Sequence, residues 1–270
     1  MQKFKLGLNK YESWWMWSFI SIITVATLYF SATGTDWSNA WNIILNWIIS
    51  PLGAITGVIC VVLVAKGNLY NYAFGIVNAI GYGTVAWQTG YYGDWLLNWF
   101  FFLPTQIFIL IYWKNHLREK TEAPIVKMRK LTPWQVVYTV AIGITALIGF
   151  GLVLHGVDWW FVNYLKKSES MYGTIAKVFG IPLLGPMFDS STEVLQIIAQ
   201  ILLIKRMAEQ WPLWIATNVI TIIMWVAVMI ADPTSIPYAL PTFIMWVAYL
   251  INSVYGTKVW YRDVRIAENV

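Results

Sequence analysis

Polar side chains recur inside stretches of this sequence that are otherwise apolar enough to lie in lipid. Glu193 and Gln196 share one face of such a stretch, because residues three or four apart lie on the same side of a helix. Trp211, Trp214 and Asn218 share one face of a second stretch. An unpaired amide or carboxylate in hydrocarbon is costly, so these groups must meet a protein partner, a ligand or enclosed water.

Side chains of the same kinds occur within other apolar stretches. They are Asp189 and Gln200 beside Glu193, Asn71, Phe74, Asn78 and Tyr82 in one further stretch, Asn98 and Gln106 in the next, and Trp246, Tyr249 and Asn252 in the last. The central members, such as Asn78 and Glu193, are expected about 12–18 Å deep, near the middle of a ~30 Å hydrocarbon core.

The chemistry of this set suits a small organic ligand. Amides and a carboxylate bind hydroxyls and primary amides, and aromatic faces bind flat rings, cationic rings above all. The alternative interpretation is that the amides hold helices together, at about 0.5–2 kcal/mol each. Together, the set favours an aromatic ligand with a sugar-like or amide-bearing polar part. Glu193 is open to two roles, as a proton site or as a fixed hydrogen-bond acceptor.

The elements that position these side chains are predicted to be transmembrane helices. The chain of 270 residues is 59% hydrophobic and 11% charged, with a mean hydropathy of +0.59, whereas a soluble domain has roughly 25% charged residues. Runs of about 20 apolar residues cross a bilayer as helices, because backbone groups in hydrocarbon have no other local partner. The predicted spans are 14–31, 41–65, 70–89, 95–113, 133–155, 182–204, 211–231 and 237–256.

Basic residues are distributed unevenly between the connections. Fifteen of the eighteen Lys and Arg residues fall on one side of the membrane, and only Lys166, Lys167 and Lys177 fall on the other. The positive-inside rule then places both termini in the cytoplasm. The first span ends near “YFSATG”, which resembles a signal-peptide cleavage site, but its length and Trp content favour an uncleaved helix. Residues 156–181 favour a helix on the external interface, with an external lid as the alternative.

Two three-helix units share sequence features. “NYAFGIVN” (71–78) and “WPLWIATN” (211–218) each place an aromatic residue four before an Asn, and Leu-Pro-Thr occurs at 103–105 and 240–242. Both units start outside, so they run the same way, as in transporters that bind substrate near midplane between repeats. Prolines in or near the spans predict hinges or static kinks. They are Pro51, Pro104, Pro186 and Pro241.

Other kinds of chemistry have little support in the sequence. Cys60 is the single cysteine, and His116 and His155 lie far apart, so neither a disulfide nor a metal site or cofactor is expected. The chain has no Gly-Lys nucleotide-binding loop and no catalytic triad or carboxylate pair at a plausible depth, which argues against ATP-driven transport and against an enzyme. The net charge of +5 follows from the membrane topology and does not indicate nucleic acid.

The Trp-x-x-Trp-x-x-x-Asn pattern at 211–218, with the spans and repeat over 41–256, resembles the signature of the PnuC family of bacterial nicotinamide riboside transporters. The resemblance implies a SWEET-like 3+1+3 fold and facilitated diffusion of nicotinamide riboside across the inner membrane. It also implies a partnership with a cytoplasmic kinase that traps the riboside for NAD biosynthesis. Thiamine, riboflavin and a small sugar stay open as alternative substrates, and a homo-oligomer stays open. The contrasting class is a membrane enzyme or a receptor without transport.

The predicted fold is an all-α integral membrane protein of about eight transmembrane helices, one extra N-terminal helix before the 3+1+3 repeat. The predicted substrate-binding residues are Trp211, Trp214, Asn218, Glu193, Gln196, Asn78, Tyr82, Gln106 and Tyr249. The predicted divisions are the N-terminal helix (1–36), a first bundle (37–116), a basic cytoplasmic loop with a linker helix (117–158), an external interfacial segment (159–181), a second bundle (182–257) and a cytoplasmic tail (258–270).

Overall fold

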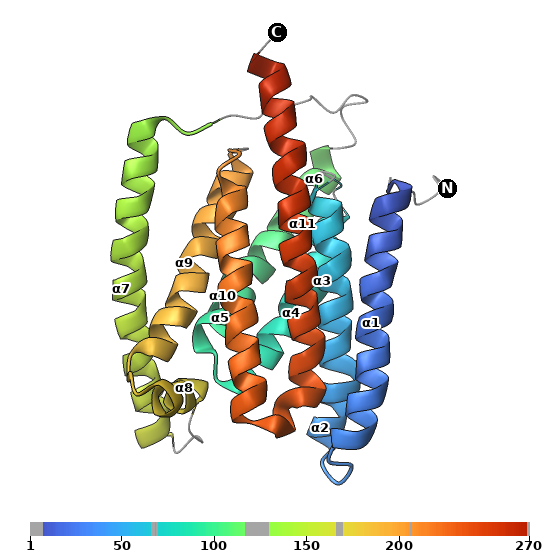
Figure 1. Cartoon of the computed structure of the whole chain (residues 1–270), viewed down its shortest axis with the longest axis vertical. Helices are drawn as coiled ribbons and strands as arrows, with labels where there is room; N and C mark the ends of the chain where they lie inside the picture. The colour runs from blue at the N-terminus through green and yellow to red at the C-terminus, as the bar shows by residue number, and fades with distance from the viewer. Residues whose placement is uncertain are drawn as a thin grey trace. The chain divides into compact units, whose positions relative to one another are not determined.

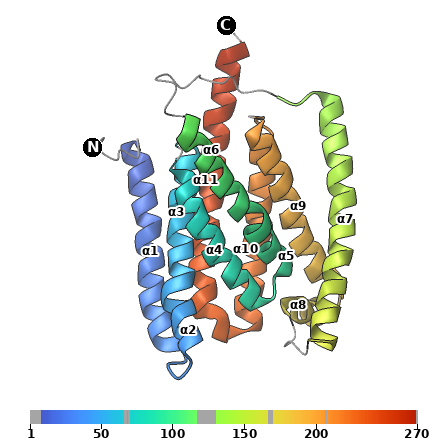
Figure 2. The ribbon, with the colours of Figure 1, turned by 180° about the vertical axis from the view of Figure 1, so that it is seen from behind.

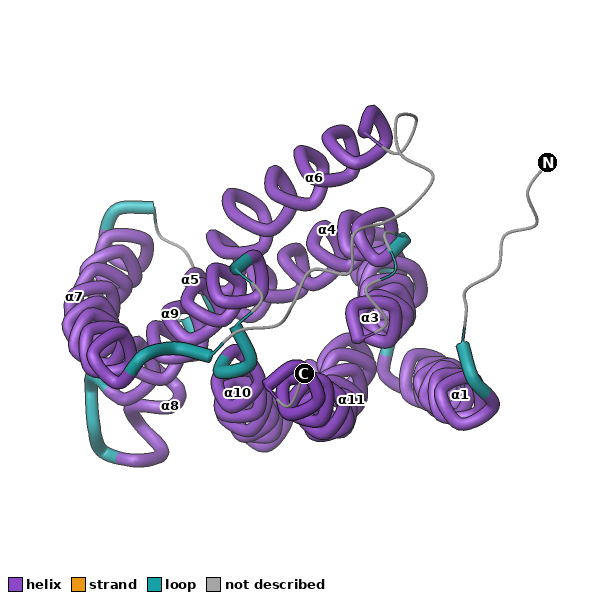
Figure 3. The backbone as a smooth tube through the Cα atoms, turned by 90° about the horizontal axis from the view of Figure 1, so that it is seen from above, coloured by secondary structure: helices purple, strands orange, loops and turns teal. Residues whose placement is uncertain are grey.

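The computed structural model of the chain describes residues 8–65, 68, 70–116, 130–165, 170–205 and 207–268. These ranges are helical and contain no strand, which Figure 3 shows, so the predicted all-α class is confirmed. Some predictions fall outside the described residues. They concern the basic loop at 117–129 and the positions of Lys66, Lys166, Lys167 and Arg206.

The helices follow the predicted apolar runs in order along the chain. Most predicted ends differ from the observed ones by a few residues. The elements are α1 (Lys10–Gly34), α2 (Ala40–Ile44), a π-helix η1 (Leu45–Ile49), α3 (Ser50–Ala65), α4 (Asn71–Thr89), α5 (Tyr92–Leu96), a π-helix η2 (Leu97–Phe102), α6 (Leu103–His116), α7 (Pro133–Asn163), α8 (Met171–Phe179), α9 (Leu184–Ile204), α10 (Gln210–Ala231), a 3₁₀ turn η3 (Pro233–Ser235) and α11 (Ile236–Glu268).

Among the described residues, six helical segments are long and apolar enough to cross a membrane. They are Lys10–Gly34, Ala40–Ala65, Tyr92–Ile111, Pro133–Asn163, Gln210–Ala231 and Pro233–Lys258. The other two predicted spans correspond to α4 and α9, which have 19 and 21 residues, or about 28 and 32 Å of helix. Both are long enough to span, and both carry the polar side chains that lower their hydropathy.

The segment after the linker span differs from its prediction. α7 continues to Asn163, so residues 156–163 extend this helix, and the separate short helix α8 follows only at Met171. No helix-breaking proline occurs between 156 and 163, and a single Gly156 costs a helix only about 1 kcal/mol. At its start, α7 is fixed by Pro133 and by a capping box between Thr132 and Gln135.

The chain forms two compact units, each of which is assembled from several segments. The first comprises Met1–Val85, Trp95–Ala123 and Asp232–Asn252, and the second comprises Ala86–Asp94, Pro124–Ala231 and Ser253–Val270. α11 therefore contributes its residues up to Asn252 to the first unit and its residues from Ser253 to the second. These units are defined by compactness and do not test the predicted bundle boundaries, which stay a prediction.

In the first unit, helices approach one another closely. α1 runs alongside α3 (Figures 1 and 3). α3 and α4 meet at Gly53 and Gly81, where a Cβ on Gly53 would lie 3.1 Å from the Gly81 Cα atom. Helices in lipid pack by van der Waals contact and therefore place small residues where backbones touch. Ser50 Oγ adds a hydrogen bond of 2.6 Å to the Tyr238 carbonyl, which ties α3 to α11.

Two prolines of the first unit lie directly after π-helical turns. η1 ends two residues before Pro51, and η2 ends two residues before Pro104. A proline has no N–H and its ring crowds the carbonyl four residues earlier, so the preceding turn widens and its carbonyls bond elsewhere. Each π-helix begins with Leu-Asn-Trp, and Asn46 and Asn98 are buried. The helix type thus changes locally before these two prolines, and the predicted hinges or kinks stay predictions.

In the second unit, α9 is the central helix. It packs against α7 and α10, and the short α8 packs on it as well; Figure 2 shows α7 alongside α9. Ser190 Oγ on α9 donates to the Leu147 carbonyl of α7 at 2.6 Å. A Cβ on Gly151 of α7 would lie 2.6 Å from the Met187 sulfur. The polar α9 is therefore surrounded by helices, as its composition requires.

Candidate functional site

In the first unit, a group of side chains from α4 and α11 meets on the backbone of α3. The Tyr249 hydroxyl donates to Asn78 Oδ1 at 3.3 Å. Asn78 Nδ2 donates to the Gly53 carbonyl at 3.0 Å and lies 3.3 Å from the Met245 sulfur. A Cβ on Gly57 would overlap these three side chains, so the glycine makes room for them. We call Gly53, Gly57, Asn78, Met245 and Tyr249 the neutral cluster.

Aromatic rings extend the neutral cluster. The Trp246 ring contacts the Tyr249 ring at a centroid distance of 5.1 Å and the Tyr82 ring at 5.5 Å. Both pairs are edge-on, the geometry that aromatic quadrupoles favour. On the same face of α4 as Asn78, Gly75 leaves room for Gln106, whose Cδ would lie 2.8 Å from a Cβ there. The structure thus groups Asn78, Tyr82 and Tyr249, with Gln106 one turn away.

In the second unit, the Trp-x-x-Trp-x-x-x-Asn face of α10 packs on the C-terminal half of α11. Asn218 Nδ2 donates to Ser253 Oγ at 2.9 Å. The Trp211 ring lies against Gly256, where a Cβ would overlap it. Trp211 and Asn218, seven residues apart on α10, therefore contact Gly256 and Ser253, which are three residues apart on α11. Trp211 and Asn218 are buried, at 3% and 1% exposed, whereas Trp214 is half-buried.

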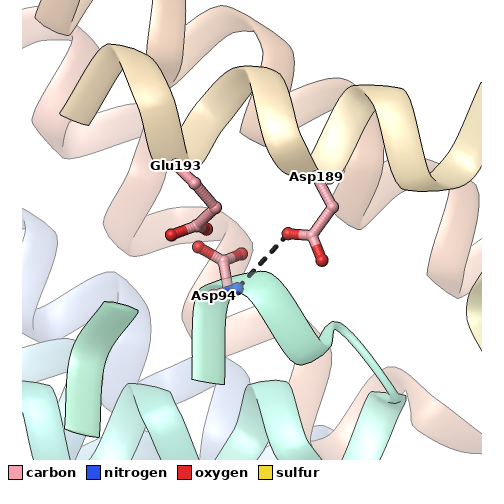
Figure 4. Close-up of side chains that lie close together, drawn as sticks. All are labelled: Asp94, Asp189 and Glu193. Atoms are coloured by element: carbon pink, nitrogen blue, oxygen red, sulfur yellow. Dashed lines mark hydrogen bonds between the residues drawn. The ribbon is translucent and has the colours of Figure 1, made fainter. Parts of the chain in front are cut away.

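A group of carboxylic acids lies between α5 and α9. Asp94, Asp189 and Glu193 each place one oxygen within 4.8 Å of the others, and all three are buried (Figure 4). Asp189 accepts hydrogen bonds from the backbone N–H groups of Gly93 at 2.9 Å and Asp94 at 3.3 Å, and from the Tyr172 hydroxyl of α8. We call Asp94, Asp189 and Glu193 the acidic cluster.

Glu193 differs from Asp189 in its partners. No backbone N–H, amide or hydroxyl donor reaches either carboxyl oxygen of Glu193 among the residues that the structure describes, although the side chain is only 1% exposed. Figure 4 shows it directed at Asp94. Three negative charges at this spacing repel one another strongly away from water, so the cluster requires a shared proton or a positive partner. Gln196, one turn further along α9, is buried, and its Nε2 has no partner in the described ranges.

Several residues of these clusters were not singled out from the sequence. Asp94 lies 95 residues before Asp189, just after a turn. Gly90, at a φ of +78°, makes that turn, because glycine adopts left-handed angles without strain. Ser253, Gly57 and Tyr172 were missed as well. The single acidic residue after two tyrosines in “YYGDW” was the available signal for Asp94. No metal-ligand spacing marked the acidic cluster, although its oxygens lie close enough to hold a cation.

Comparison with known proteins agrees with this architecture. A family model described as nicotinamide mononucleotide transporter matches residues 46–262. A Neisseria mucosa protein named nicotinamide riboside transporter PnuC is 30% identical over 96% of this chain and 84% of its own length. A Haemophilus influenzae protein of that name is 27% identical over 98% and 95%. A solved structure, described as the crystal structure of the vitamin B3 transporter PnuC, is similar with a TM-score of 0.65 and 28% identity, covering 96% of this chain and 93% of that one.

Proposed function

The chain belongs to the nicotinamide mononucleotide transporter family, and from this premise we propose that it carries nicotinamide riboside by facilitated diffusion across a bacterial inner membrane. It is a multi-pass membrane protein and a transporter, not an enzyme. The relatives named above are riboside transporters, whereas the family description names the mononucleotide. These two compounds differ by a phosphate, so the charge of the protein interior discriminates between them.

The buried acidic cluster is the observation that supports the riboside. Nicotinamide riboside carries a positive pyridinium ring and no phosphate, whereas the mononucleotide adds a dianionic phosphate. Asp94, Asp189 and Glu193 place negative charge inside the second unit. Charges interact strongly where water is excluded, so a permeating phosphate would be repelled and a pyridinium attracted.

The aromatic and amide residues fit the rest of this substrate. Trp214 offers a half-buried indole face for a cationic ring. Asn218 and Gln196 offer carboxamides with hydrogen-bonding capacity left over, which suits the carboxamide and the ribose. Asn78 and Tyr249 can contact substrate only by giving up their present partners. Of the nine predicted residues, we propose Trp214, Asn218, Glu193 and Gln196 as substrate contacts, and Asn78 and Tyr249 as residues that hold helices together.

The charge argument also orders the alternative substrates. Thiamine is cationic and remains the main alternative, whereas riboflavin and small sugars are neutral and gain nothing from the acidic cluster. The proposal includes cytoplasmic termini, in line with the distribution of basic residues. It also includes the SWEET-like repeat, the predicted domain boundaries, and trapping of the riboside by a cytoplasmic kinase that feeds NAD biosynthesis.

Uptake into liposomes that contain the purified protein tests the proposal. We expect labelled nicotinamide riboside to equilibrate across the membrane without any imposed ion gradient, and unlabelled riboside inside to accelerate entry by exchange. Excess thiamine and nicotinamide mononucleotide, added in separate assays, serve as competitors. If thiamine enters the liposomes and the riboside does not, thiamine would take the place of the riboside as the proposed substrate. Binding without entry would indicate a receptor.

A further inference from the structure

The carboxamide of Asn218 is half satisfied. Its Nδ2 donates to Ser253 Oγ at 2.9 Å, and its Oδ1 has no hydrogen-bond partner within the described part of the chain. The side chain is 1% exposed, so Oδ1 is also removed from water. A buried acceptor without a donor has lost its hydration and gained nothing in return, and such groups in native proteins call for an explanation.

The partner on α11 decides which end of the carboxamide is used. The nitrogen and oxygen ends of an amide have nearly the same shape but opposite hydrogen-bonding roles. A serine hydroxyl within a helix commonly donates to a carbonyl one turn earlier, which leaves its lone pairs to accept from a neighbour. An accepting Ser253 holds the nitrogen end of Asn218 and leaves the oxygen end open.

We propose that Ser253 is a positioning residue that holds Asn218 with its oxygen presented to the substrate. This inference rests on the proposed function. A fixed acceptor selects a ligand that brings a donor, and nicotinamide riboside has two kinds of donor, the carboxamide N–H₂ and the ribose hydroxyls. The Asn of the Trp-x-x-Trp-x-x-x-Asn pattern thereby joins α10 to α11 through its nitrogen and accepts a hydrogen bond from the substrate through its oxygen.

Competition between two orientations of Asn218 provides the test. In Ser253→Ala the carboxamide loses its anchor and can turn its nitrogen toward the ligand, so the site no longer prefers a donor. Binding is measured by calorimetry on the purified full chain with three ligands. They are nicotinamide riboside, the riboside with a ring carboxylate in place of the carboxamide, and the riboside without its 2′ and 3′ hydroxyls.

The readout is the ratio of affinities between nicotinamide riboside and each analogue. We expect Ser253→Ala to lower one of these ratios about 3- to 10-fold, the worth of one neutral hydrogen bond. The ratio that falls identifies the donor as the carboxamide or the ribose. Ser253→Thr keeps the hydroxyl and is expected to keep both ratios. Ser18→Ala, which removes a serine hydroxyl that donates to the Trp14 carbonyl of α1 at 2.8 Å, is the matched control.

The outcomes separate this inference from the proposed function. Unchanged ratios in Ser253→Ala, or an equal loss of affinity for all three ligands, would overturn the positioning role. Should the Ala variant not fold, Ser253→Cys, a near isostere with a weak acceptor, is expected to give the same change in ratio. A wild-type protein that binds none of the three ligands would instead overturn the proposed function itself.

Discussion

The neutral cluster of the first unit and the acidic cluster of the second handle buried polarity in different ways. In the neutral cluster, Asn78 has partners at both ends of its carboxamide, and they come from α3 and α11. In the acidic cluster, Asp189 has three N–H or hydroxyl donors, whereas Glu193 has no such donor in the described ranges and faces the Asp94 carboxyl group. A polar group in lipid is tolerated either because the protein satisfies it or because something else does.

This difference assigns separate physical roles to the two clusters. A satisfied amide holds helices together and needs no ligand, so the neutral cluster contributes to stability. Crowded buried carboxyl groups lower stability in isolation and gain from a cation, so the acidic cluster contributes to substrate preference. The comparison therefore predicts that substitutions in the first cluster change the free energy of unfolding, whereas substitutions in the second change affinity.

Glu193→Gln is expected to have the largest effect. With a cationic ring bound, the substitution leaves the acidic cluster one negative charge short with almost no change in shape, and a charge about 5–8 Å from such a ring contributes about 2–3 kcal/mol at an effective dielectric constant of 20. Affinity for nicotinamide riboside should fall roughly 30- to 150-fold, as measured by calorimetry. Thermal stability should stay the same or rise, because repulsion within the cluster is reduced.

The control for Glu193→Gln is an uncharged form of the ligand. The 1,4-dihydro form of nicotinamide riboside has the same groups but an uncharged ring, so its affinity should not change. Equal losses for both ligands would show that Glu193 acts through shape or hydrogen bonding. The assigned difference between the two clusters would then be wrong.

Asn78→Ala is the corresponding change in the neutral cluster. It leaves the Tyr249 hydroxyl and the Gly53 carbonyl without their partner, at a cost of about 1–3 kcal/mol of unfolding free energy. Scanning fluorimetry in detergent should show a lower midpoint, while riboside affinity changes less than about 3-fold. Asn163→Ala, which removes an exposed amide at the end of α7, is the control, and its effect should stay within about 0.5 kcal/mol.

The sequence predicted the elements better than their contacts. Long apolar runs leave a helix as the only choice, so α4 and α9 were placed correctly although their polar residues lower their hydropathy. The acidic cluster was not predicted, because Asp94 approaches Asp189 only after the chain has folded. The role of Asn218 was left open for a similar reason. Its use by the protein or by a ligand depends on Ser253, and no helical periodicity relates positions on different helices.

Trp214→Ala tests the aromatic contribution of the second unit. The indole is half-buried, so its removal should cost little stability. Loss of a cation–π contact of about 0.5–2 kcal/mol should weaken riboside binding roughly 3- to 30-fold. Trp214→Phe keeps an aromatic face and should recover part of the affinity. A large drop in the unfolding midpoint would show instead that Trp214 holds helices together, as Trp211 does against Gly256.

Tyr249→Phe is expected to have the smallest effect. It removes one hydroxyl and keeps the ring contact with Trp246 at 5.1 Å, so the loss is about 0.5–1.5 kcal/mol of unfolding free energy. The loss should disappear in an Asn78→Ala background, because the partner is already gone, and a double-mutant cycle measures this coupling. A full loss in both backgrounds would place another partner on the hydroxyl. A fall in riboside affinity beyond about 10-fold exceeds what one neutral hydrogen bond contributes; it would make Tyr249 a substrate contact and remove the distinction between the two clusters.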